Sequence, residues 1–166
     1  MRIKSFSYLV AALFLATACA ETMQDGGAGQ GSGGSQQAAS SVKPGTGRDF
    51  VVNVGDRVFF EFDKSSLNSD SRTQLEKQAA WLKKFGNVSL TLEGHADERG
   101  TREYNLALGE RRANSAKDFL VALGIAPNRI RVISYGKERP AALGQNEAAW
   151  RQNRRAVTIV AGSPGS

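Results

Sequence analysis

Two residues of opposite charge, Asp97 and Arg112, are the side chains in this sequence best suited to bind a ligand together. Asp97 follows an alternating apolar run at 88–92 that predicts a strand, and Arg112 lies on a helical pattern that begins shortly afterwards. A helix N-terminus beside a strand end attracts anions through its free N–H groups and its dipole. A pocket that combines a carboxylate, a guanidinium and such amides is complementary to a zwitterion, whose ammonium and carboxylate share one carbon.

Both residues also have a purely structural interpretation. Asp97, together with Glu98, could simply cap the following helix. Arg112 lies four residues after Leu108 on the apolar side of that helix, so it could form a buried ion pair with Asp97 or Asp63. From the residues alone, the ion pair and the ligand site are equally supported.

The sequence around this pair resembles a known family. The matching blocks are 94–101 (GHADERGT), 103–105 (EYN) and 108–114 (LGERRAN), with 62–63 (FD) upstream and 134–138 (SYGKE) and 153–157 (NRRAV) downstream. In order and spacing they resemble the outer-membrane protein A-like peptidoglycan-binding domain family, and within it the lipoproteins of the Tol-Pal system. The resemblance covers about 58–160, and with it we favour the ligand site over the ion pair.

The resemblance implies a role for each matching residue. It implies that Asp97 contacts the ammonium of meso-diaminopimelate in the peptidoglycan stem peptide, and that Arg112 takes a carboxylate of the same peptide. The other residues expected to bind are Asp63, Glu98, Arg99, Gly100, Thr101, Tyr104, Asn105 and Leu108. The single histidine, His95, is expected to support the loop by hydrogen bonding.

The resemblance also implies partners. Family members dock a periplasmic β-propeller of the Tol system on a surface that overlaps the peptidoglycan pocket, and other Tol-Pal components are possible partners. The implied role is to tether the outer membrane to the cell wall, with envelope integrity and constriction at cell division as consequences. An exposed charged rim at 98–103 is suited to steering a protein partner. The alternative is a general wall-anchoring module that is not engaged with the Tol system.

Enzymatic and nucleic-acid functions are less well supported. One histidine and one cysteine provide too few nitrogen or sulfur ligands for a zinc site, and no Gly-x-Ser-x-Gly motif is present. We therefore expect no catalysis, metal or cofactor, with a cell-wall hydrolase as a remote alternative. The net charge of +6 comes from basic residues interspersed with acids in an exported chain, which favours anionic wall polymers over nucleic acid as the attracted partner.

The first residues predict export and a lipid anchor. Arg2 and Lys4 precede an apolar run at 6–15 that is too short to span a bilayer and is typical of a signal peptide, here 1–18. Ordinary cleavage would leave Cys19, the only cysteine, as a free thiol in an oxidising compartment.

A lipobox instead makes Cys19 the lipidated first residue of the mature chain, although Ala16 stands where a leucine is commoner. We favour lipidation, because the acyl chains of a lipidated cysteine provide stable membrane anchoring. Ala20, which follows the cysteine, resembles the pattern of lipoproteins sent to the outer membrane.

Composition divides the rest of the chain. Residues 19–48 are rich in Gly, Ser and Gln and predict a flexible tether that follows the lipidated cysteine, with a reach of about 30 Å. Residues 49–161 predict one domain, and 162–166 a disordered tail.

The expected fold is α+β, a mixed β-sheet with helices packed on one face in the order β-α-β-α-β-α-β. Strands are expected at 57–62, 88–93, 130–135 and 155–160, with a possible short one at 51–54. Helices are expected from caps at 68–71 to Phe85, at 102–123 with Gly124 as C-cap, and at 146–153 with Trp150 packed inward.

Overall fold

The computed structural model describes residues 42–161, which belong to one compact unit, 39–166. The expected signal peptide, Cys19, the tether up to residue 41 and the tail at 162–166 lie outside the described residues. Within 42–161, no helix is both long and apolar enough to cross a membrane.

The main helices and strands follow the expected order. They are β1 (Arg57–Phe59), α2 (Ser69–Lys84), β2 (Leu90–His95), α3 (Arg102–Ala122), β3 (Ile130–Gly136), α4 (Glu147–Asn153) and β4 (Arg155–Val160). A single helical turn, α1 (Gly47–Asp49), and a π-helix, η1 (Phe50–Val54), precede β1, and a 3-10 turn, η2 (Pro127–Arg129), precedes β3. Among the described residues, the first helical turn therefore starts at Gly47, upstream of the expected boundary at Asp49.

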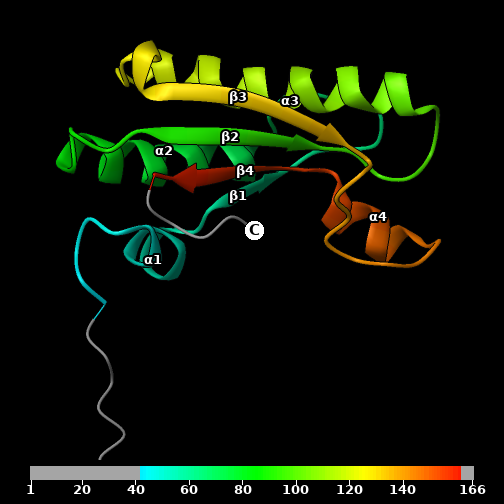
Figure 1. The fold of residues 1–166 in the computed structure, drawn as a ribbon, viewed down its shortest axis with the longest axis horizontal. Helices are drawn as coiled ribbons and strands as arrows, with labels where there is room; N and C mark the ends of the chain where they lie inside the picture. Colours follow the sequence, from blue (N-terminus) through cyan, green and yellow to red (C-terminus); the bar gives the residue numbers. More distant parts are fainter. Residues whose placement is uncertain (1–41, 162–166) are drawn as a thin grey trace, which may run out of the picture. The chain divides into compact units, whose positions relative to one another are not determined.

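The four strands form one mixed sheet in the order β1-β4-β2-β3. Strands β2 and β3 are parallel and are connected through α3, whereas β4 runs antiparallel to both of its neighbours. Figure 1 shows α2 and α3 on the same side of the sheet, where α3 packs on β2 and β3, and α2 packs on β1. The shorter α4 lies beyond the edge of the sheet at which β4 begins (Figure 1). The expected α+β class and mixed sheet are confirmed.

The hydrophobic core fills the space between the sheet and the two long helices. Many of its buried members come from α2, α3 and the facing sides of the strands: Leu75, Leu82, Ala113, Ala116, Leu120, Val58, Leu92 and Ala156. The helical spacing of the first five and the alternation along the strands are the patterns from which these elements were predicted.

The expected strand at 51–54 is wrong, because these residues form the π-helix η1. Phe50, its first residue, is buried against Trp81 of α2 with ring centroids 5.0 Å apart. The side-chain amide of Gln74 donates to the carbonyls of Val54 (2.7 Å) and Gly55 (2.9 Å). Hydrogen-bond donors from α2 therefore replace the backbone donors that a neighbouring strand would provide.

Strand β1 also ends earlier than expected, at Phe59 rather than at 62. The amide of Phe60 still donates to the carbonyl of Arg154 (2.9 Å). The chain then turns away from the sheet, and Asp63 adopts a positive φ of 56°.

Thr101, not Asp97 or Glu98, caps helix α3. Its hydroxyl oxygen accepts from the amide of Tyr104 (3.2 Å). At the other end the C-cap is Leu123 and not Gly124, which follows it at φ +92°; the amide of Ile125 donates to the carbonyl of Leu120 (3.0 Å). Asp97 is thereby free for another role.

Helix α3 lies against β2 at a contact between two glycines, which generates a first prediction. A Cβ at Gly94 would lie 1.8 Å from the carbonyl oxygen of Gly109. Because this backbone cannot yield without moving the whole helix, we expect Gly94→Ala to lower the free energy of unfolding by about 3 kcal/mol. Urea denaturation followed by circular dichroism measures the change.

The matched control is Gly86→Ala, since a Cβ at Gly86 meets no atom within 4 Å. Its unfolding midpoint should stay close to that of the parent protein. Equal midpoints for the two variants would show that the close packing of α3 on β2 is not required.

Candidate functional site

A cavity of about 210 Å³ lies where β1 and β2 end beside the N-terminal half of α3. Its lining contains every residue expected at the binding site except Glu98 and Thr101, and it also includes Phe62: Phe62, Asp63, Asp97, Arg99, Gly100, Tyr104, Asn105, Leu108 and Arg112. Residues far apart in the sequence therefore converge on one small cavity.

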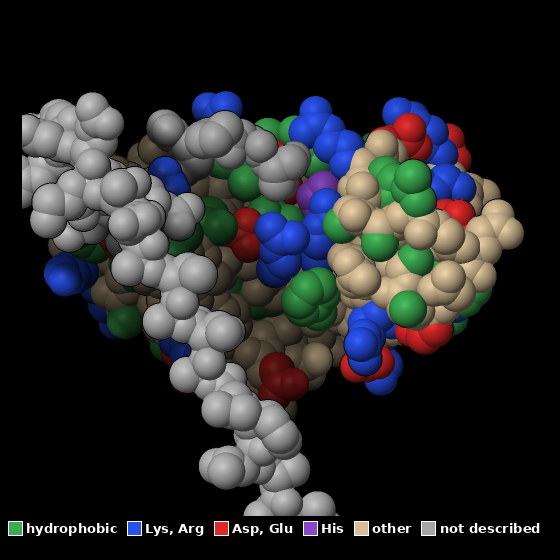
Figure 2. Space-filling model, turned by 90° about the horizontal axis from the view of Figure 1, so that it is seen from below, with side chains coloured by type: hydrophobic (Ala, Val, Ile, Leu, Met, Phe, Trp, Pro, Cys, Tyr) green, Lys and Arg blue, Asp and Glu red, His purple; other side chains and the backbone are tan. Residues whose placement is uncertain are grey.

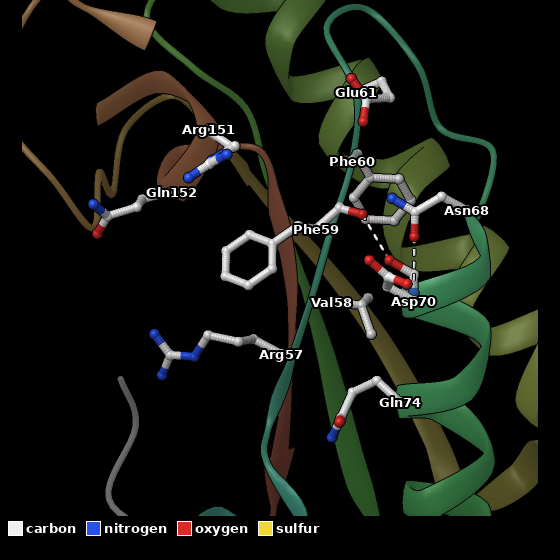
Figure 3. Close-up of a pocket in the computed structure, with 11 residues that line it drawn as sticks. Arg57, Val58, Phe59, Phe60, Glu61, Asn68, Asp70, Gln74, Arg151 and Gln152 are labelled. Atoms are coloured by element: carbon white, nitrogen blue, oxygen red, sulfur yellow. Dashed lines mark hydrogen bonds between the residues drawn. The ribbon is translucent and has the colours of Figure 1, made fainter. Parts of the chain in front are cut away.

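A larger cavity of about 580 Å³ lies elsewhere, between β1, the start of α2 and α4 (Figure 3). It contains none of the residues of the sequence motif. We assign the candidate site to the smaller cavity because opposite charges converge there.

Arg112 is fully buried and holds three carbonyl oxygens. Its Nη1 donates to His95 (2.8 Å), its Nε to Lys64 (2.9 Å) and its Nη2 to Glu61 (3.1 Å). The alternative of a direct ion pair with Asp97 or Asp63 is not found in the described part of the chain. Burial lowers the pKa of Arg112 to about 10, so the side chain remains a cation at neutral pH.

Asp97 is only 4% exposed and is already surrounded by donors. It accepts from the backbone N (3.2 Å), the Nε (3.2 Å) and the Nη2 (2.7 Å) of Arg99, and from Nη1 of Arg154 at 3.4 Å. Burial acts to raise the pKa of Asp97, but the hydrogen bonds from Arg99 outweigh it and the pKa lies below its ordinary value. Asp97 is therefore a fixed negative charge.

Arg99 is clamped between two aromatic rings. The guanidinium carbon lies 4.0 Å from the ring centroid of Phe62 and 4.0 Å from that of Trp150. The indole N–H of Trp150 donates to Glu98 (3.0 Å). The expectation that Trp150 packs inward is wrong: it is half-buried against the loop that follows β2.

Asp63 and Tyr104 form the exposed side of the cavity. The Tyr104 hydroxyl donates to the carboxylate of Asp63, and this hydrogen bond raises the pKa of Tyr104. The positive φ of Asp63 is uncommon for a residue other than glycine and often marks a functional turn. Asp63 thus provides a second carboxylate at the mouth of the cavity.

The loop between β2 and α3 is held by side chains of α3 and of the segment that follows β3. The side-chain amide of Asn105 donates to the carbonyl of Arg99 (2.8 Å), and the Nζ of Lys137 donates to the carbonyl of Gly100 (2.7 Å). Glu98 and Thr101 serve this loop as the partner of Trp150 and as the helix cap, without lining the cavity.

The expected role of the His95 side chain is wrong. Its backbone carbonyl holds Arg112, but within residues 42–161 neither ring nitrogen has a hydrogen-bond partner. Burial, followed by the charges of Arg155 and Arg139, lowers the pKa of His95 to about 3. The imidazole is therefore neutral and does not support the loop.

Three residues that contribute to the candidate site were given no role in it from the sequence, namely Phe62, Trp150 and Arg154. Arg154 is buried and bridges Asp97 and Glu147, to which its Nη2 donates at 2.5 Å. Phe62 and Arg154 lie in the sequence blocks that match the family, so the resemblance was a signal from which their contribution could be predicted. Trp150 gives no such signal, because a lone aromatic residue on a short helix is typical of a core position.

The charges of the cavity suit binding of a zwitterion. Carboxylates from Asp63 and Asp97 lie in the same lining as the guanidiniums of Arg99 and Arg112. Among the described residues, no group of His, Cys, Asp or Glu side chains could hold a metal ion.

Comparison with known proteins gives consistent matches. The model of the OmpA family matches residues 59–154. The peptidoglycan-associated lipoprotein of Rhizobium meliloti is 54% identical over 125 residues, which cover 75% of this chain and 71% of that protein. The protein of the same name from Pseudomonas putida is 37% identical over 160 residues, or 93% of this chain and 95% of that one.

A solved structure agrees with the sequence matches. The crystal structure of the peptidoglycan-associated lipoprotein from Burkholderia pseudomallei has a TM-score of 0.62 and 41% identity, and covers 63% of this chain and 89% of that one. These relatives are named as lipoproteins and not as enzymes, in agreement with the expectation that this chain is not an enzyme. The family match, together with these identities and coverages, shows that the chain belongs to the OmpA family.

Proposed function

We propose that this protein is an outer-membrane lipoprotein that binds peptidoglycan without cleaving it, through the diaminopimelate residue of the stem peptide. The observation that supports this most strongly is the convergence of Asp63, Asp97 and Arg112 on one cavity. The relatives named as peptidoglycan-associated lipoproteins support peptidoglycan as the ligand.

The free N–H groups of Arg112 are suited to a carboxylate. A guanidinium has five N–H donors, and three hydrogen bonds to backbone carbonyls are formed. Those carbonyls fix its orientation, so a ligand carboxylate meets a cation that has already lost its side-chain freedom. A charge-assisted hydrogen bond in such a buried place contributes about 1.5–3 kcal/mol.

The ammonium of the ligand has two carboxylates available. Asp97 already accepts four hydrogen bonds, of which the one from Arg154, at 3.4 Å, is the longest. We infer that the ammonium replaces this contact and is shared with Asp63 at the mouth of the cavity. Arg99 stays in place, because its two aromatic neighbours and Asp97 hold it on three sides.

Co-sedimentation with purified diaminopimelate-type sacculi tests this site. We expect Asp97→Asn and Arg112→Lys each to weaken binding about ten- to one-hundredfold, because each removes one half of the charge complement. Circular dichroism confirms that each variant is folded before binding is measured.

The matched controls are Asp118→Asn and Arg111→Lys, which make the same changes at exposed positions of α3. Both should sediment like the parent protein. Unchanged binding of the folded Asp97 and Arg112 variants would show that the site is wrong, and release of soluble wall fragments would support the hydrolase alternative.

We propose further that residues 1–18 are removed as a signal peptide, that Cys19 carries the lipid anchor (diacylglycerol and an N-linked acyl chain such as palmitate), and that residues 49–161 are the wall-binding domain on a flexible tether. The names of the relatives support a lipoprotein.

Mass spectrometry of protein purified from its native host tests the anchor. The expected mature chain starts at Cys19 and has the mass of an acylated cysteine. Cys19→Ser should move the protein from the membrane to the soluble periplasmic fraction without changing its unfolding midpoint. A free thiol at residue 19 in the native protein would refute the anchor.

We also propose that the charged rim of the site, at residues 98–103, docks a Tol-system β-propeller during envelope constriction at cell division. Ion pairs and carbonyl contacts order this rim: Nε of Arg102 lies 3.3 Å from Glu138, and Lys137 donates to the carbonyl of Glu98 (3.2 Å). An ordered charged rim steers association and fixes partner orientation.

Isothermal titration of the protein with the propeller of its own host, with and without saturating stem peptide, tests this overlap. If both use one surface, the peptide must weaken propeller binding, and the propeller must weaken peptide binding by the same factor. Equal affinities would place the propeller elsewhere, while no binding would favour a wall anchor outside the Tol system.

A further inference from the structure

The sheet face opposite α2 and α3 carries two buried polar side chains, each with two nitrogen atoms that make no hydrogen bond in the described part of the chain. His95 is 1% exposed and Arg155 is 5% exposed. Within residues 42–161, both ring nitrogens of His95 and the Nε and Nη1 of Arg155 have no hydrogen-bond partner. Most buried polar groups are hydrogen-bonded, so four such atoms in one place retain hydrogen-bonding capacity for a ligand.

The strand register places these two side chains next to each other. Gly94 pairs with Ala156 between β2 and β4, which puts His95 opposite Arg155. Phe59 pairs with Arg155 between β1 and β4. Because side chains alternate along a strand and Ala156 belongs to the core, Arg155 and its two neighbours face away from α2 and α3.

Groups from β3 and the following loop complete the cluster. The His95 ring lies 5.6 Å from the ring of Tyr135, and the guanidinium carbon of Arg139 lies 3.8 Å from the Tyr135 ring centroid. Nη2 of Arg155 donates to the carbonyl of Arg139 (3.3 Å). The carbonyl of Arg139 also acts to raise the pKa of His95. It forms no hydrogen bond with either ring nitrogen.

The cluster is electropositive. Burial and then the charge of Arg57 lower the pKa of Arg155, and the charges of Arg155, Arg139 and Arg57 lower that of His95. The acidic groups are Glu93, whose Oε2 lies 3.8 Å from His95, and Asp56, which is paired with Arg57 at 2.8 Å. Three guanidiniums against two carboxylates leave an excess of one positive charge, since His95 is neutral.

A groove lies beside this cluster, without including His95 or Arg155 in its lining. It is the cavity of about 580 Å³ whose lining includes Arg57, Phe59 and Arg151 together with the acidic Glu61 and Asp70. Figure 3 shows Arg57, Phe59 and Arg151 extending to the side of β1 away from α2. Figure 2 shows basic side chains gathered beside hydrophobic ones on one face of the molecule, close to the only histidine. Phe59 is 40% exposed and is the cross-strand neighbour of Arg155.

We propose that this cluster is a second binding site, which takes the carboxylate of an acidic protein segment at Arg155 and His95 while an apolar side chain of the same segment packs on Phe59. A carboxylate accepts the N–H groups that are without partners and balances the excess charge. The exposed aromatic ring favours an apolar-acidic peptide over wall glycan, and the pocket at Asp97 and Arg112 is not involved.

Nuclear magnetic resonance of the ¹⁵N-labelled protein, titrated with acetyl-Phe-Glu-amide, tests the site. We expect the Arg155 Nε–H and the His95 imidazole signals to shift with the peptide. Acetyl-Phe-Gln-amide, which lacks only the charge, should leave them unchanged. Arg155→Lys should weaken binding at least tenfold, because lysine cannot present the same planar donors.

Three comparisons complete the experiment. Arg131→Lys changes an exposed arginine of β3 and should bind like the parent, and so should Asp97→Asn, which separates this site from the proposed wall site. Equal shifts with the Glu and Gln peptides, or unchanged binding by folded Arg155→Lys, would overturn the proposal. Shifts of the same signals by a stem-peptide fragment, but not by acetyl-Phe-Glu-amide, would replace the protein segment with a wall ligand and also overturn it.

Discussion

The three hydrogen bonds from Arg112 to backbone carbonyls are the interaction on which the rest of the candidate site depends. They join the turn after β1, through Glu61 and Lys64, to the end of β2 at His95. A buried cation is costly unless its donors are matched. Here it is matched by carbonyl oxygens and not by a carboxylate, which leaves both acidic side chains of the cavity for other contacts. One side chain of α3 thereby positions Asp63 and Asp97.

The loop that carries Asp97 and Arg99 is fixed by two further sets of contacts. The contact between Gly94 and Gly109 lets α3 approach β2 closely enough for Arg112 to reach past it. From the other side, Arg154 bonds Asp97, and Trp150 stacks on Arg99. Charge, stacking and close backbone packing therefore determine one loop geometry, and a preorganised loop costs little entropy when a ligand binds.

The sequence was sufficient for the parts of the fold that depend on periodicity and on caps. The helices α2 and α3 and the three longer strands were predicted to within a few residues, because their apolar spacing continues over many positions. The π-helix at 50–54 was missed, since its stability comes from Gln74 and Trp81 of a later helix. The carbonyl partners of Arg112 and the adjacency of His95 to Arg155 were also missed, because strand pairing brings together residues distant in the sequence.

The central claim is that Arg112 recognises a carboxylate of diaminopimelate. The most direct test uses two stem peptides, one with diaminopimelate and one with lysine in its place, because lysine lacks that carboxylate. Isothermal titration of the parent protein should give at least tenfold tighter binding of the diaminopimelate peptide than of the lysine peptide, a difference of about 1.4 kcal/mol. In Arg112→Lys most of that difference should disappear. Equal affinities of the two peptides for the parent protein, or the same preference in parent and variant, would contradict the account.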